Sequence, residues 1–167
     1  AGVGWLRFSA AVLCTLSAVT AAWMLVVMRD PLRFTSRLIT GVGIAIGSMG
    51  VGVMYYIGPF SAGSMVLLLG IFFFGMSHSR VAARATYATI ASLYFVLTTA
   101  LAAGVLTDRS LFSTELAQPF TRWFQVIMSQ VLFGLTFYLA RRSRRASEAA
   151  IDRVDTASRK IQQREAQ

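Results

Sequence analysis

Five long apolar runs without a charged residue constrain this chain more than any other feature. They cover Phe8–Met28, Leu38–Ile57, Phe60–Met76, Thr86–Leu106 and Trp123–Ala140. A helix needs roughly 20 residues to cross the hydrocarbon core of a bilayer, and about 17–25 are tolerated. Because lipid offers no hydrogen-bond partners to the backbone, each run is predicted to be helical. The fold class expected is an all-α membrane protein with five transmembrane helices.

The composition agrees with this class. Hydrophobic residues make up 56% of the 167 residues and charged residues only 14%, whereas soluble domains carry about 25% charged residues. The single cysteine, Cys14, excludes an intrachain disulfide scaffold. The first run exceeds the roughly 7–15 apolar residues of a signal peptide, which favours a membrane span. The Gly58-Pro59 break is so short that the second and third runs are predicted to form a tight hairpin.

The positions of the basic residues predict the orientation. Arginines follow the first run (Arg29, Arg33 and Arg37), the third run (Arg80 and Arg84) and the fifth run (Arg141, Arg142, Arg144 and Arg145). Bases concentrate in cytoplasmic loops, so the C-terminus is expected in the cytoplasm. The net charge of +9 therefore reflects membrane orientation. No nucleic-acid partner is expected, since no basic patch is interleaved with exposed aromatics.

Two parts are expected, a five-helix transmembrane module over 1–140 and a basic cytoplasmic connector helix over 141–167. In the connector, apolar residues recur at spacings of 4, 3 and 4, namely Ala150, Val154, Ala157 and Ile161. This spacing is typical of a short coiled-coil seam and predicts a homodimer. The alternative is a solvated helix that holds the fifth span in place.

Side chains for catalysis are scarce. The chain has one histidine, one cysteine and no carboxylate inside any run, so no enzyme activity, catalytic residue, metal site or cofactor is expected in this segment. His78 is expected to bond a lipid headgroup or the backbone. Gly43 and Gly47 form a GxxxG pair, which lets helices approach closely. The pair is expected to pack against the first and third helices of the same subunit, with a dimer face as the alternative.

The fifth run carries a polar stripe. Gln125, Ser129 and Thr136 fall on one side of a helix, and Gln130 points about 100° away. One interpretation is hydrogen bonding to the fourth helix, through residues such as Thr89, Ser92 and Thr99. The sharper hypothesis is that these four residues bind a small amphipathic ligand beneath the loop over 107–122.

Two stretches resemble a known family. They are the hairpin Tyr55–Ser61 leading to Gly70-Ile71-Phe72-Phe73-Phe74-Gly75, and Leu139–Arg145 leading through Ala149–Asp155 to Gln162–Ala166. Together they resemble the N-terminal membrane region of bacterial, notably myxobacterial, serine/threonine protein kinases. The resemblance implies a location in the inner membrane of a bacterium. It also implies a cytoplasmic kinase domain, with ATP and magnesium, beyond Gln167. Histidine kinases and class III nucleotide cyclases carry similar multispan modules and remain open as outputs.

The expected function is a non-catalytic membrane sensor that anchors the protein and relays a signal through the connector to an output domain. Its expected partners are membrane lipids, a second copy of the chain and that output domain. The alternatives are a passive anchor and dimeriser, or an accessory subunit of a larger membrane complex. The sequence that follows Gln167 would best separate these possibilities.

Overall fold

A computed structural model describes residues 2–27, 29, 35–107 and 119–165. These residues form helices and contain no strand, as expected for the all-α class. The elements are α1 (Gly2–Val27), α2 (Ser36–Ile57), the short 3-10 helix η1 (Ala62–Ser64), α3 (Met65–Gly75), α4 (Arg80–Ala102) and α5 (Pro119–Glu165).

Four of these helices are long and apolar enough to cross a membrane. They are α1, α2, α4 and the first part of α5. Large apolar side chains on them are exposed, among them Val19, Val96 and Ile127, as a lipid environment allows. The chain is therefore a multi-pass membrane protein.

The third run differs from its expected form. A helix over Phe60–Met76 was predicted, but α3 has only 11 residues, or about 16 Å of helix. The preceding residues form a turn, in which the Ser61 amide donates to the Gly58 carbonyl oxygen at 2.9 Å. Gly58 has a φ of 123°, a conformation that favours glycine. The chain therefore turns back into the bundle before α3 begins.

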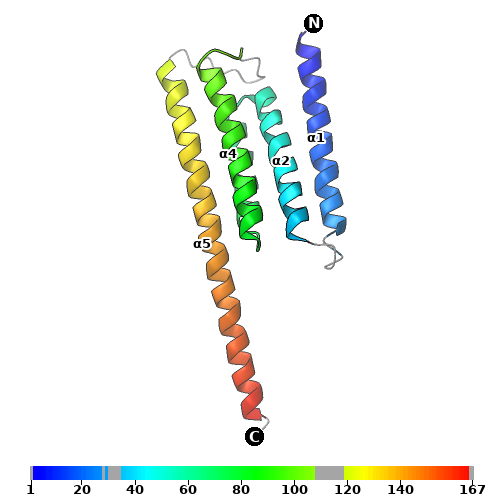
Figure 1. Cartoon of the computed structure of the whole chain (residues 1–167), viewed down its shortest axis with the longest axis vertical. Helices are drawn as coiled ribbons and strands as arrows, with labels where there is room; N and C mark the ends of the chain where they lie inside the picture. The colour runs from blue at the N-terminus through cyan, green and yellow to red at the C-terminus, as the bar shows by residue number, and fades with distance from the viewer. Residues whose placement is uncertain (1, 28, 30–34, 108–118, 166–167) are drawn as a thin grey trace.

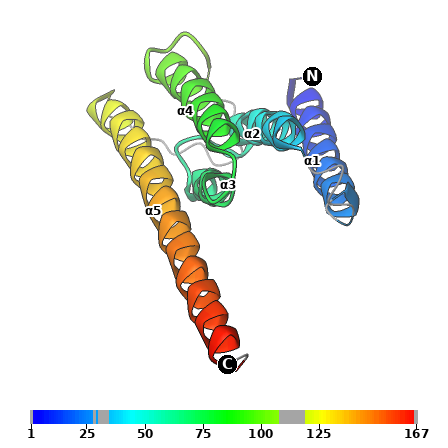
Figure 2. The same cartoon turned by 60° about the horizontal axis from the view of Figure 1, so that its bottom comes forward.

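The helices form a bundle in which α3 lies on one face of a row made by the other four. In Figure 1, α1, α2, α4 and α5 stand in a row, and Figure 2 shows α3 beside α2, α4 and α5. Helices α1 and α5 run in one direction, whereas α2 and α4 run in the other. We call the end at which α5 leaves the bundle the tail end. The hydroxyls of Ser36 on α2 and Ser79 before α4 meet there at 2.6 Å.

The GxxxG pair packs within the chain, but its main partner helix was predicted incorrectly. A Cβ atom on Gly43 would lie 2.2 Å from Thr86 Oγ1, and one on Gly47 would lie 2.6 Å from Ile90 Cγ1. Both partners belong to α4. Only Phe74 of α3 also approaches Gly43, at 3.1 Å. Helix α4 packs against α2 because α3 returns the chain to the end of the bundle where α2 begins.

Helix α5 is a single helix of 47 residues. It begins in the bundle and continues far beyond the tail end (Figure 1). The predicted fifth span and connector helix are thus parts of one element. The side chains of Ala150, Val154 and Ala157 are exposed, and that of Ile161 lies outside the described side chains. The coiled-coil seam stays a prediction.

Candidate functional site at the exit of α5

The polar stripe of α5 meets the turn between α2 and α3. Gln125 Nε2 donates to the carbonyl oxygen of Phe60 at 2.7 Å, and the Tyr94 hydroxyl of α4 donates to the carbonyl oxygen of Pro59. Irregular backbone at membrane depth requires protein partners because lipid supplies none. Gln125 and Tyr94 provide them, so they stabilise the turn.

The other stripe residues lie nearby but bond differently. Ser129 Oγ donates to the carbonyl oxygen of Gln125 within α5 at 2.8 Å. Gln130 Nε2 donates to the carbonyl oxygen of Ala91 on α4 at 3.3 Å, and Thr136 is half-buried. The neighbouring-helix interpretation holds for Gln130, although its partner is a backbone group and not a hydroxyl of α4. Ligand binding by the stripe stays a prediction, and residues 108–118 of its expected cover lie outside the described residues.

A second polar region lies at the tail end, where Arg141 joins α5 to the end of α3. Its Nη1 atom donates to the carbonyl oxygens of Gly75 at 3.2 Å and Ser77 at 2.9 Å. The last carbonyls of a helix lack partners within it and carry partial negative charge. Arg141 satisfies them. Close packing supports this joint, since a Cβ atom on Gly75 would lie 2.7 Å from Ala140 Cβ.

One turn further along α5, Arg144 connects the tail to the α3–α4 junction. Its Nε atom donates to Glu148 Oε1 at 2.8 Å, and its Nη2 atom lies 3.1 Å from His78 Nδ1. Glu148 Oε1 also lies 3.5 Å from that ring nitrogen. The hydrogen bond from Arg144 is the main cause that lowers the pKa of Glu148, and the charge of Arg144 adds to it. We call Arg144, Glu148 and His78 the exit latch.

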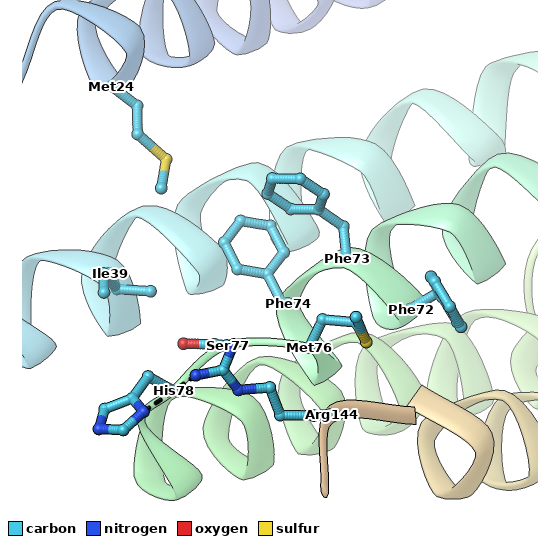
Figure 3. Close-up of a pocket in the computed structure, with 9 residues that line it drawn as sticks. All are labelled: Met24, Ile39, Phe72, Phe73, Phe74, Met76, Ser77, His78 and Arg144. Carbon is cyan, nitrogen blue, oxygen red and sulfur yellow. Dashed lines mark hydrogen bonds between the residues drawn. The ribbon is translucent and has the colours of Figure 1, made fainter. Parts of the chain in front are cut away.

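A cavity of about 440 Å³ adjoins the exit latch. Apolar side chains from α1, α2 and the α3 region line most of it, and Ser77, His78 and Arg144 line its polar end (Figure 3). Its volume falls in the range of about 300–1,000 Å³ that is usual for small-molecule sites. The cavity therefore has an apolar part and a polar end, which suits an amphipathic molecule.

Arginines concentrate at the tail end. Arg29, Arg37, Arg80, Arg84 and the arginines of 141–145 lie there, whereas Arg7 and Arg122 lie toward the opposite end of the bundle. Arg33 and Asp30 lie outside the described residues. In the described part of the chain, no group of three His, Cys, Asp or Glu residues is placed to hold a metal ion.

Comparisons of the chain with protein-family models, curated proteins and solved structures find no match. We therefore infer the function from the geometry of the helices and their contacts. The sequence indicated His78 as an isolated interfacial residue and missed its contact with Arg144. The two residues are 66 positions apart, and no local pattern connects them.

Proposed function

We propose that this chain is a membrane input module that passes a conformational signal along α5 to a cytoplasmic output domain. The observation that supports this proposal most directly is that α5 continues without a break over 47 residues. A helix without a break transmits rotation or tilt from one end to the other, whereas a flexible linker does not.

Contacts along α5 support the proposal. Gln125 binds the α2–α3 turn inside the bundle, Arg141 binds the end of α3, and Arg144 reaches His78 before α4. A change in the packing of α3 or α4 would therefore move α5 both inside the bundle, at Gln125, and at the tail end, at Arg141 and Arg144. The cavity beside the exit latch provides a place where an amphipathic signal would act on Arg144.

The proposed topology has five passes with the tail end in the cytoplasm. The short α3, η1 and the turn before them together make the third pass, since α2 and α4 run in the same direction (Figure 1). The arginines at the tail end support a cytoplasmic location in a bacterial inner membrane. A reporter fused after Gln167 tests this, and periplasmic activity of that reporter would contradict it.

The proposed output is a serine/threonine kinase, which follows from the resemblance alone. In-frame kinase coding sequence downstream of Gln167 would support it, whereas a stop codon there would favour an accessory subunit. A passive anchor and dimeriser is the second candidate, and the exposed Ile151 and Val154 on the tail favour it. Replacing the spans with an unrelated dimeric membrane helix separates the two, because regulation survives only for a passive anchor.

Insertions after Ala149 in the full-length protein test the relay, because they leave the Arg144–Glu148 pair of the exit latch intact. Two added alanines rotate the distal helix by about 200°, whereas seven added residues return it to within about 20° of its original phase. We expect the two-residue insertion to change output activity in membrane vesicles and the seven-residue insertion to restore it. Equal activity of both insertions and the wild type would contradict a rigid relay.

A further inference from the structure

A small basic groove lies between α4 and α5 at the tail end. It has a volume of about 220 Å³ and is separate from the cavity at the exit latch. Its lining consists of two arginines from α4, two arginines from α5 and two aromatic residues, namely Arg80, Arg84, Arg141, Arg145, Phe137 and Tyr138.

The charges that line this groove are all of one sign. Arg80 and Arg84 are separated by four positions on α4, as are Arg141 and Arg145 on α5, and like charges at this spacing destabilise a helix. No acidic side chain of the described residues lines the groove. Glu148 pairs with Arg144 at the exit latch. The groove thus concentrates positive charge that a bound anion would neutralise.

The surroundings specify the kind of anion. Guanidinium groups match phosphate geometry through paired N–H donors. Tyr138, which lines the groove, is exposed, as are the apolar side chains of Val81 on α4 and Leu135 one turn before Tyr138 on α5. A ligand with a phosphate and an adjoining hydrocarbon chain would use both surfaces, because basic pockets between membrane helices bind anionic headgroups.

We propose that the groove binds the phosphate headgroup of an anionic phospholipid in the leaflet at the tail end. The acyl chains then lie along the exposed apolar faces of α4 and α5. The bound phosphate bridges the two helices and fixes α5 where it leaves the bundle. Binding itself does not depend on an output domain, whereas an effect on signalling rests on the proposed function.

The test compares phosphatidylglycerol with phosphatidylcholine on the purified chain. Native mass spectrometry counts bound lipids, and thermal unfolding in detergent reports stabilisation. We expect phosphatidylglycerol to bind at least tenfold more tightly than phosphatidylcholine. The double variant Arg84→Gln/Arg145→Gln should reduce that preference at least fivefold. The control Arg29→Gln/Arg37→Gln removes the same charge at the same end, outside the groove, and should change the preference less than twofold.

Three outcomes would overturn the proposal. In the first, both double variants lose the preference for phosphatidylglycerol equally. In the second, the groove variant retains that preference. In the third, inorganic phosphate stabilises the chain as well as the lipid does. If the double glutamine variant does not fold, the single variants Arg84→Gln and Arg145→Gln replace it. Each should lose part of the preference for phosphatidylglycerol, and an unchanged preference in both would overturn the proposal. The readout needs no output domain, so failure here is distinct from failure of the relay.

Discussion

Substitution of Gly43 by alanine tests the central packing of the bundle. The added Cβ atom would lie 2.2 Å from Thr86 Oγ1 and 3.1 Å from the ring of Phe74. Thr86 is fully buried, and rotation of its side chain places a methyl group near the same space. Helix α2 must therefore move away from α4 to accept one methyl group.

The loss of stability expected for Gly43→Ala follows from overpacking of the helix interface. Extra atoms in a packed core cost about 1–3 kcal/mol, which corresponds to roughly a 5- to 150-fold lower folding equilibrium constant. Gly41 provides a matched control on the same helix, because a Cβ atom there has nothing within 4 Å. Gly41→Ala should leave the free energy of unfolding unchanged or raise it by up to about 1 kcal/mol, because alanine favours a helix more than glycine does.

Unfolding by SDS in mixed micelles, followed by tryptophan fluorescence, measures the difference between the variants. The experiment also decides between the two interpretations of the GxxxG pair. Packing within the chain predicts that Gly43→Ala destabilises the chain at any protein concentration. Equal stability of the Gly43 and Gly41 variants, or loss of a dimer without loss of monomer stability, would refute the packing described for α2 and α4.

Other contacts give further predictions. Replacing Arg141 by glutamine removes the charged donor from the end of α3 and should lower the free energy of unfolding by about 1.5–3 kcal/mol, whereas the exposed Arg142→Gln should change it little in the same SDS titration. Gln125→Leu should cost about 0.6 kcal/mol, the typical value for such a bond in a bilayer, and a gain in stability would contradict its role at the turn. The pKa of Glu148 is below its ordinary value of 4.5, so its ion pair should persist above pH 4.5 and be lost as the pH falls through the lowered pKa. Carbon NMR of the carboxyl group checks this, and Arg144→Gln should return the pKa toward 4.5.

The sequence predicts the long helices well because their signal is local. Charge-free runs of membrane length place α1, α2, α4 and the first part of α5. The third run is different because Phe60 and the residues of η1 are as compatible with a turn as with a helix. The start of α3 is set by the Gly58 conformation, by the hydrogen bonds of the Ser61 and Ser64 side chains within the turn, and by the partners on α4 and α5.

The candidate site was harder to predict because its contacts join residues that are far apart in the sequence. The polar stripe on α5 follows from helical periodicity, but the turn carbonyl that Gln125 binds is set by tertiary packing. From the sequence, the arginines of the tail end indicated only the orientation of the chain in the membrane. Their separate contacts, Arg141 with α3 and Arg144 with His78, depend on how α3 returns beside α5.

The length of α5 sets the scale of any motion at its far end. Residues 142–165 continue the helix beyond Arg141, a lever of roughly 36 Å at 1.5 Å per residue. A tilt of about 5° at Arg141 displaces the tip by roughly 3 Å over that length. Under the proposed relay, an ångström-scale displacement where α5 leaves the bundle would therefore be enlarged at the far end of the helix.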